Sequence, residues 1–424
     1  MRIGFVPETR NFVGGVFQYT NTMLLSLDRI IEEDTIVLIS SNFQMLQELD
    51  IQNPHFAHIA LRNSHIENWK QKFIDIAGEK LAGNIWLYFS HLLQPRRYGG
   101  KMDDIKRRMK LRKFLKDEKI DLIIYSAHST MSFEVGLPYI IAIHDIQHRL
   151  HPEFPEVASY GKWYHREYFF RNAIKHALFV LVDSEIGKED ALRFYNLYGA
   201  SPEKIKILPM LPAQNCNRKK ISDKEKAEIQ KQYRLPQNFL FYPAQFWPHK
   251  NHINIIKALK LLEKKYKIVA PIVFCGSHNS SIQKSVFKKI QKIAKEINVH
   301  KQVKYIGFVP DVDLGTIYSM ATALVMPTFF GPSNIPPLEA FSFGCPVITS
   351  NIRGIKEQVG DAAILVDPKN VEEIAVAIFR LMTDSSLRNK LVNRGLKKKN
   401  EYTSAHYDQK LKEIIKDAKK ILKK

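Results

Sequence analysis

Cysteine is scarce in this sequence, and long apolar runs are missing. Three of the 424 residues are cysteines and no two of them form a CxxC pair, which disfavours a zinc knuckle or a redox motif. Few and scattered cysteines are typical of a reducing compartment. No stretch reaches the ~18 apolar residues of a membrane-spanning helix, and the N-terminus lacks the apolar core of a signal peptide. We therefore expect a cytoplasmic protein.

Acidic residues are few relative to basic ones. Lys and Arg number 64 against 43 Asp and Glu, which gives a formal net charge of +21. This balance favours phosphate-bearing partners: a nucleic acid, an anionic membrane surface or a phosphorylated substrate. The charges are dispersed and no nucleic-acid-binding module is recognisable, so a nucleic acid is the least favoured partner. The hydrophobic content of 45% is ordinary for a globular protein and excludes a disordered chain.

Short apolar runs alternate with amphipathic stretches in two series. This alternation predicts parallel sheets, and we expect an α/β protein of two doubly wound, Rossmann-like domains facing a central cleft. The domains are expected at 1–210 and 237–400, joined by a linker at 211–236 and followed by a lysine-rich helix at 401–424. Strands are expected at 2–6, 35–40, 121–126, 139–144, 177–182 and 204–209, and then at 239–244, 271–276, 303–308, 323–328, 346–351 and 362–367.

Two connections between a strand and a helix carry residues suited to an anion. Gly14 and Gly15 open a helix, where backbone amides can approach a phosphate, although glycine pairs also occur in ordinary turns. His249 and Lys250 precede the helix expected at 252–265, where a cation and backbone donors could clamp a diphosphate. Taken alone, Lys250 could equally be one exposed lysine among many.

The segment 327–351 joins a Gly/Pro/Asn loop to a carboxylate in apolar surroundings. Glu339 lies within PPLEAF, on a face that should be largely buried. Carboxylates are rarely buried without a partner. A ribose diol would be one partner, and a helix-capping or inter-helix ion pair is the alternative.

The segment HDIQHRLH at 144–151 suggests a metal site as one hypothesis. Histidines four residues apart bind zinc when they share a helix face. This segment directly follows a strand and Pro152 lies just beyond it, so a loop is favoured over a regular helix and a metal is the less favoured hypothesis. The residues concerned are His144, Asp145, His148 and His151.

Nearly the whole chain resembles the retaining glycosyltransferases of family 4, which have the two-domain GT-B fold. The match is longest over 300–370, where the family has its donor-site signature. The motifs that carry the resemblance are IPPLEAFSFGCPVITSN (335–351), GIKEQVGDAAILVDP (354–368), GFVPDVDLGTIYSMATALVMP (307–327), YPAQFWPHKN (242–251), VGGV (13–16) and AIHDIQHRLHPEF (142–154).

The resemblance implies a role for each candidate residue. Glu339 would hold the ribose hydroxyls of a nucleotide-sugar donor, Lys250 and the amide of Gly15 would contact its diphosphate, and His144 would lie near the transferred sugar. These enzymes are typically metal-independent, so we expect neither a metal nor a cofactor, because preorganised donors can stabilise the departing diphosphate. The expected catalytic residues are His144, Asp145 and Lys250; the expected donor-binding residues are Gly14, Gly15, Gln245, His249, Lys250, Ser333, Asn334, Ile335 and Glu339.

Two positions depart from the family pattern. The family usually has an arginine at the position of Gln245 and a second glutamate at the position of Gly331. One cation and one carboxylate are therefore missing. Ser333 and Asn334 are available instead, and a neutral amide bonds a sugar hydroxyl more weakly than a carboxylate does.

His144 has two interpretations. It ends the strand expected at 139–144, taken as the fourth of the N-terminal domain, where it could bond a sugar hydroxyl or the acceptor. The alternative is a buried histidine bonded to the backbone, with Asp145 holding the turn.

Two windows of the sequence are strongly basic. Residues 96–119 carry 11 basic and 4 acidic side chains and follow the apolar segment 83–94. That combination suits an anionic membrane surface, and a core-facing helix followed by a solvated one is the alternative. The window 394–424 has the same balance of 11 basic and 4 acidic residues, and it resembles the helix by which the family's C-termini cross back to the N-terminal domain.

We therefore expect a retaining, metal-independent glycosyltransferase of the hexosyltransferase type, acting in surface polysaccharide or lipopolysaccharide synthesis. Its partners would be a nucleotide-diphosphate sugar and a glycan or lipid-linked acceptor, at or near the inner face of the membrane. Two alternatives stay open: a non-catalytic binding subunit of the same fold, and a nucleotide-sugar epimerase.

Overall fold

The computed structural model describes residues 1–7, 14–40, 51, 53–60, 97–159, 161–212, 221–331 and 333–423. The chain divides into two compact units. The first consists of Met1–Glu153, Val157–Pro209 and Ser404–Lys424, and the second of Phe154–Glu156 and Met210–Thr403. Among the helices that the structure describes, none combines the length and apolar character needed to cross a membrane.

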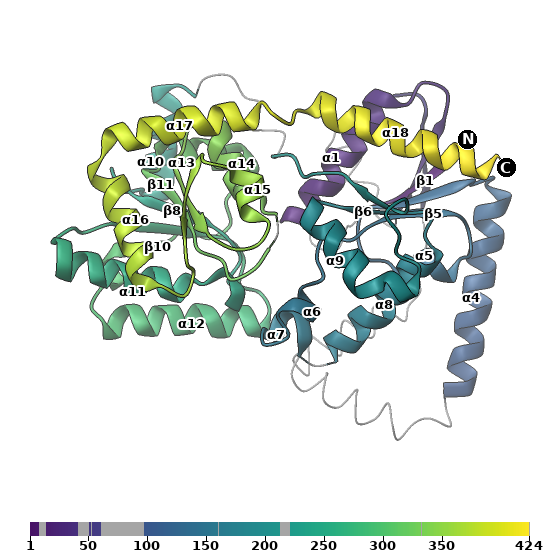
Figure 1. Cartoon of the computed structure of the whole chain (residues 1–424), viewed down its shortest axis with the longest axis horizontal. Coiled ribbons are helices and arrows are strands. Elements are labelled where there is room, and N and C mark those ends of the chain that lie inside the picture. The colour runs from purple at the N-terminus through teal and green to yellow at the C-terminus, as the bar shows by residue number, and fades with distance from the viewer. Residues whose placement is uncertain are drawn as a thin grey trace. The chain divides into compact units, whose positions relative to one another are not determined.

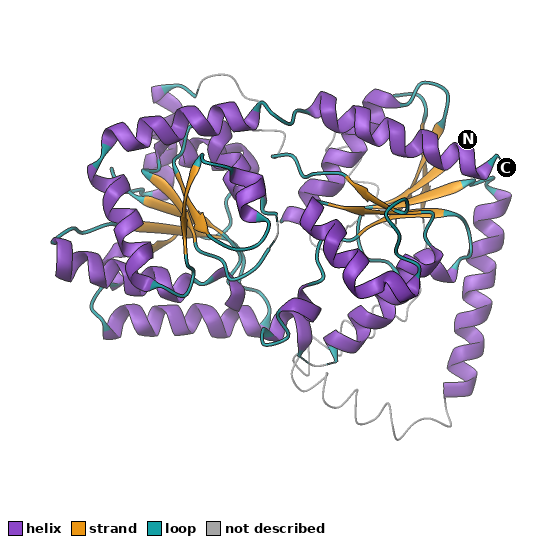
Figure 2. Ribbon diagram, viewed as in Figure 1, coloured by secondary structure: helices purple, strands orange, loops and turns teal. Residues whose placement is uncertain are grey.

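The first unit is built on a parallel sheet whose described strands follow the order β3-β2-β1-β4-β5-β6-β7. Helices cover both faces of the sheet (Figures 1 and 2), and the central strands β4 and β6 are accordingly continuous apolar runs, LIIY and FVLV. The strands are β1 (Arg2–Val6), β2 (Thr35–Ser40), β3 (Phe56–Ala60), β4 (Leu122–Tyr125), β5 (Tyr139–Ala142), β6 (Phe179–Val182) and β7 (Ile205–Ile207). The helices are α1 (Gly15–Ile30), α4 (Arg97–Asp117), α5 (Met131–Glu134), α6 (Gln147–Leu150), α7 (Pro155–Ala158, which spans the boundary between the units), α8 (Lys162–His176), α9 (Glu185–Tyr195) and α18 (Ser404–Leu422), with a 3-10 turn at Asn196–Tyr198.

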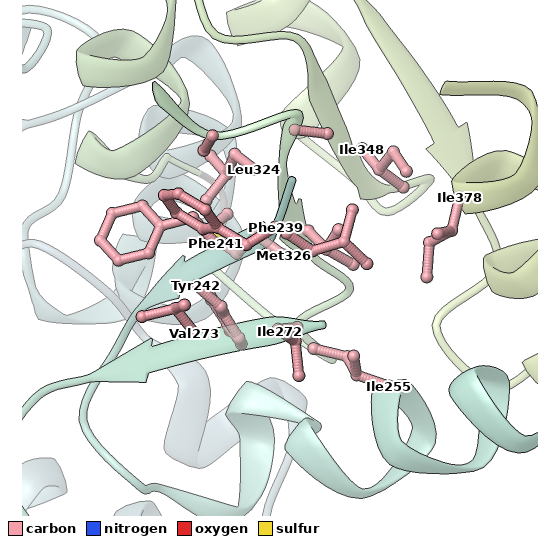
Figure 3. Packing of buried hydrophobic residues seen from close by; sticks show 14 of the residues in the cluster. Phe239, Phe241, Tyr242, Ile255, Ile272, Val273, Leu324, Met326, Ile348 and Ile378 are labelled. Atoms are coloured by element: carbon pink, nitrogen blue, oxygen red, sulfur yellow. The ribbon is translucent and has the colours of Figure 1, made fainter. Parts of the chain in front are cut away.

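The second unit has a parallel sheet with the order β10-β9-β8-β11-β12-β13. Its core lies between this sheet and the flanking helices, as Figure 3 shows for side chains of the central strands facing Ile255 and Ile378. The strands are β8 (Leu240–Pro243), β9 (Ile272–Cys275), β10 (Val303–Tyr305), β11 (Ala323–Met326), β12 (Val347–Ser350) and β13 (Ala363–Val366). The helices are α10 (Asp223–Tyr233), the 3-10 turn η4 (Pro248–Lys250), α11 (His252–Leu261), which continues as a π-helical turn at Leu262–Tyr266, α12 (Ser281–Glu296), α13 (Asp311–Met320), α14 (Ile335–Ser342), α15 (Ile355–Val359), α16 (Val371–Thr383) and α17 (Ser385–Lys399), with a 3-10 turn at His300–Gln302.

The prediction of two doubly wound α/β domains is confirmed, with two differences in detail. β3 is an additional strand, so β5, which precedes His144, is the fifth strand of its sheet in chain order and not the fourth. Part of the segment expected as a linker is helix α10, which begins with a capping box between Ser222 and Glu225. Ile229 of α10 is buried in the core of the second unit.

Helix α18 packs in the first unit against α1 (Figure 1). Its apolar stripe is buried, and charged residues on either side pair with α1 and the turn after it. Arg29 makes a two-pronged contact to Asp408 at 2.7 and 2.8 Å, and Lys412 lies 2.9 Å from Glu32. The buried stripe consists of Tyr407, Leu411, Ile414, Ile415 and Ala418.

Candidate active site

The loop after β8 is fixed in place by hydrogen bonds to the ends of neighbouring strands. Asn251 adopts a left-handed conformation with φ of 57°, and its side-chain amide donates to the carbonyls of Pro327 at 2.8 Å and Pro368 at 2.7 Å. The Tyr242 hydroxyl donates to the carbonyl of Lys250 at 3.0 Å. These bonds hold Lys250 at the carboxyl edge of the sheet, where ligands of open parallel sheets bind.

The Lys250 side chain is partly buried, and no carboxylate is hydrogen-bonded to its ammonium group among the described residues. Its Nζ donates to Oδ1 of Asn334 at 3.4 Å. Burial lowers the pKa of Lys250 to about 8, and the charge of Glu156 opposes this shift. An anion bound here would supply the missing countercharge.

Glu339 is buried on α14, and its partner is a neutral hydroxyl. The Tyr318 hydroxyl of α13 donates to Oε2 of Glu339 at 2.9 Å. Burial, with a smaller contribution from the charge of Asp311, raises the pKa of Glu339 to about 7. The described contacts contain no ion pair to Glu339, and the partner that they show is the Tyr318 hydroxyl of the neighbouring helix α13.

Asn334 lies at the N-terminus of α14 and is held by Gln358, a residue that the sequence analysis missed. The Asn334 backbone N–H donates to Oε1 of Gln358 at 3.0 Å, and Nε2 of Gln358 donates back to the Asn334 carbonyl at 2.8 Å. Ser333 and the buried Ile335 flank Asn334 in the chain. This arrangement fixes the amide that contacts Lys250.

Gly331 is explained by the local backbone. Its φ is +125°, and an added Cβ would come within 3.0 Å of Nδ2 of Asn334. The Asn334 amide donates to the Gly331 carbonyl at 3.1 Å. A glutamate at this position would strain the loop as it stands, so the missing carboxylate is coupled to the placement of Asn334.

Gln245 is engaged with neighbouring side chains. Its Oε1 accepts hydrogen bonds from Nε1 of Trp247 at 2.9 Å and from Nε2 of Gln283 at 3.1 Å. Gln283 also forms the capping box at the start of α12 with Ser280. The position therefore carries an anchored neutral amide where the family has a cation.

His249 contacts Glu156, which reaches it from a distant part of the chain. Oε1 of Glu156 accepts from the His249 backbone N–H at 3.0 Å and from Nδ1 at 2.7 Å. The His249 ring stacks on Phe330 with a centroid separation of 4.1 Å and an interplanar angle of 15°. No sequence signal pointed to Glu156, because its partner lies 93 residues away.

In the first unit, Gly14 and Gly15 form the start of α1. Gly14 is the N-cap residue with φ of 97°, a conformation that favours glycine, and its carbonyl accepts from the Gln18 backbone N–H at 3.1 Å. Residues 8–13 of the expected glycine loop lie outside the described residues.

His144 follows β5, and both of its ring nitrogens are engaged. Nε2 lies 3.0 Å from the Ser126 carbonyl, and Nδ1 lies 3.4 Å from Oδ1 of Asp183. Burial alone would lower the pKa of His144, but the charge and hydrogen bond of Asp183 and the Ser126 carbonyl outweigh it and raise the pKa. Since both partners are acceptors, the geometry favours the charged imidazolium and matches the alternative of a buried, bonded histidine.

Asp145 and the histidines after it hold local structure. Oδ1 of Asp145 accepts from the Gln147 backbone N–H at 3.0 Å and pairs with Arg166, which outweighs burial and keeps the pKa of Asp145 low. His148 lies 2.8 Å from Glu167. Gln147–Leu150 form one helical turn, α6, where the sequence favoured a loop. In the part of the chain that the structure describes, no group of three metal-ligating side chains is assembled.

The candidates therefore form two groups, one in each unit. In the second unit, Lys250 follows β8 and contacts Asn334, which follows β11. Glu339 is buried on α14 of the same unit. Gly14, Gly15, His144 and Asp145 belong to the first unit.

Comparisons with known proteins agree with this architecture. Residues 223–398 match the family model described as glycosyl transferases group 1. The O-antigen chain mannosyltransferase B of Escherichia coli is 26% identical over 250 residues, which cover 59% of this chain and 63% of that protein, less than two thirds of its length.

Two solved structures show the same fold over almost all of the chain. A glycosyltransferase from Rickettsia africae superposes with a TM-score of 0.69 at 14% identity, covering 98% of both chains. Anabaena HepE in complex with UDP-glucose gives a TM-score of 0.69 at 15% identity, covering 98% of this chain and 100% of that one. The fold is GT-B.

Proposed function

We propose that this chain transfers a sugar from a nucleoside-diphosphate sugar to a glycan or lipid-linked acceptor, because residues 223–398 match the glycosyl transferases group 1 family model. The observation that carries the proposal is the presence in one unit of two ionisable groups whose hydrogen-bond partners are neutral. These groups are the Lys250 ammonium, which contacts Asn334, and the buried Glu339 carboxylate, which contacts Tyr318. A cation and a carboxylate are what the diphosphate and the ribose diol of such a donor require.

On the donor side, Lys250 takes the diphosphate and Glu339 accepts from the ribose hydroxyls. The UDP-glucose bound by HepE supports this class of donor. Negative charge grows on the diphosphate as its bond to the sugar breaks, so a preorganised ammonium group stabilises the transition state more than the ground state. We therefore propose that the Lys250 side chain, and no metal ion, stabilises this negative charge.

The reaction we propose retains the configuration of the sugar. The bond from the anomeric carbon to the diphosphate oxygen breaks, and the acceptor oxygen bonds to the same face of that carbon. The acceptor hydroxyl proton passes to the leaving diphosphate oxygen, so no protein nucleophile is required.

His144 contributes from the first unit in this proposal. A sugar hydroxyl can contact its ring only by replacing a present partner, and the bond to Asp183 at 3.4 Å is the longer of the two. Asp145 positions this segment through Arg166 and the turn at Gln147.

Surface glycan synthesis is the proposed setting. The Escherichia coli relative is an O-antigen chain mannosyltransferase. A peripheral contact with an anionic membrane fits the exposed Ile105 and Met109 on α4, which lie among lysines such as Lys106 and Lys110. The apolar segment at 83–94 that precedes α4 lies outside the described residues.

A non-catalytic binding subunit is the second candidate, and the neutral Gln245 and Gly331 favour it. Nucleoside-diphosphate release from UDP-glucose or GDP-mannose, measured with and without a lipid-linked oligosaccharide, separates the two. Release and sugar incorporation support the transferase, binding without release supports the subunit, and an altered free nucleotide sugar without acceptor supports an epimerase.

A further inference from the structure

Three residues at Phe154–Glu156 belong to the second unit, although the chain on either side of them belongs to the first. Phe154 contacts Phe329 and Phe330, with ring centroids 5.6 and 5.2 Å apart. Glu156 is the second residue of α7, and its side chain is only 6% exposed. The segment thus brings a carboxylate into the second unit from a different part of the chain.

The two oxygens of the Glu156 carboxylate have different surroundings. Oε1 accepts two hydrogen bonds from His249, one from the backbone N–H and one from Nδ1. Oε2 is buried and has no hydrogen-bond partner among the described residues. Burying a carboxylate oxygen without a hydrogen-bond donor costs free energy. This atom is therefore suited to accept a hydrogen bond from a ligand.

The carboxylate is held rigidly. His249, which anchors Oε1, stacks on Phe330, and its carbonyl accepts from the Thr328 hydroxyl at 3.0 Å and from the Phe329 backbone N–H at 2.8 Å. Gly331, which follows Phe330 in the chain, contributes no side chain. Oε1 is therefore anchored before a ligand binds, and the side chains that cover the buried Oε2 must shift for a ligand hydroxyl to reach it.

The positive charge of Lys250 indicates which hydrogen-bond donor suits Oε2 of Glu156. Glu156 is close enough to Lys250 for its charge to act on the ammonium group. A metal ion at Oε2 would be repelled by Lys250, and no metal-ligating cluster is present among the described residues. A ligand with a diphosphate for Lys250 and a hydroxyl group next to it satisfies both groups.

We propose that Oε2 of Glu156 accepts a hydrogen bond from a hydroxyl group of the donor sugar and so determines which sugar the protein accepts. This inference rests on the proposed function of the second unit as a nucleotide-sugar site. It assigns the sugar-selecting carboxylate to a segment outside the motifs singled out from the sequence.

The test compares nucleotide sugars with the bare nucleotides. Affinities of UDP-glucose, UDP, GDP-mannose and GDP are measured by calorimetry for the wild type and for Glu156→Gln, which keeps an oxygen for His249 and removes the charge. We expect the variant to bind the bare nucleoside diphosphate within about twofold of wild type and to lose roughly 10–100-fold in affinity for the preferred nucleotide sugar. Glu153→Gln is the matched control, because it removes an equal charge three residues earlier from a carboxylate that is 62% exposed, and it should behave as wild type.

Deoxy analogues of the preferred sugar then identify the hydroxyl. For one analogue, wild type and Glu156→Gln should bind equally, because the group that Glu156 contacts is gone. Equal losses for nucleotide and nucleotide sugar would reduce Glu156 to a residue that positions His249, and unchanged affinities for both would also overturn the proposal. If wild type binds neither nucleotide sugar nor nucleotide, the proposed function itself fails, and this inference fails with it.

Discussion

The pH dependence of nucleotide binding should report directly on Lys250. Burial lowers the pKa of this lysine to about 8 in the ligand-free protein. A bound diphosphate adds a countercharge and raises that pKa, so binding takes up a proton wherever the free lysine is deprotonated. The Lys250 contribution to affinity should therefore be lost above about pH 8, where the free lysine loses its proton.

The expected size follows from the pKa. At pH 9 a group with a pKa near 8 is about one tenth protonated, so the affinity for a nucleoside diphosphate should fall about tenfold between pH 7 and pH 9. Calorimetry in two buffers of different ionisation enthalpy would also detect the proton that is taken up at pH 8.5.

Two variants provide the controls. Lys250→Arg keeps its charge across this range and should lack the decline above pH 8. Lys250→Ala should bind weakly at every pH and lose ~10²–10³ in transfer rate while its fold survives. A wild-type affinity that stays constant to pH 9, or near-normal transfer by Lys250→Ala, would refute the placement of the diphosphate at Lys250.

Three further predictions concern other parts of the protein. Glu339→Gln should weaken binding of the bare nucleoside diphosphate, because an amide accepts less well from a diol, and equal calorimetric affinities would make Glu339 structural. His144→Ala should lower transfer strongly and leave nucleoside-diphosphate affinity almost unchanged, whereas joint loss of thermal stability and nucleotide binding would make it architectural. Leu411→Ala in α18 should lower the free energy of unfolding by about 2–5 kcal/mol in denaturant titrations, since Leu411 is buried against the first unit; a change below about 0.5 kcal/mol would show that α18 does not pack as described.

The fold could be predicted from the sequence because its strands are short apolar runs buried on both faces. β3 was missed because FAHIA contains a histidine and no long apolar run. α10 was assigned to the linker because its composition is polar and rich in lysine. In the structure Ile229 is buried, and the Tyr233 hydroxyl donates to Oδ2 of Asp313 on α13 at 2.7 Å.

Partners of the candidate residues could not be predicted, since they depend on contacts between distant segments. Tyr318 lies 21 residues from Glu339, Gln358 lies 24 from Asn334, and Glu156 lies 93 from His249. Residue type indicated which groups could do chemistry, and the folded chain determines which of them lack a partner. Lys250 illustrates this difference: the sequence left open an ordinary exposed lysine, and the folded chain places its side chain, partly buried, beside Asn334.

Sugar transfer itself is the most direct test of the central proposal. Purified protein is incubated with UDP-glucose or GDP-mannose and a lipid-linked oligosaccharide, and nucleoside-diphosphate release and the anomeric configuration of the product are followed by NMR. We predict release that depends on both the acceptor and Lys250, with the donor's anomeric configuration retained in the product. Binding of these nucleotide sugars without release, or a product of inverted configuration, would contradict this account.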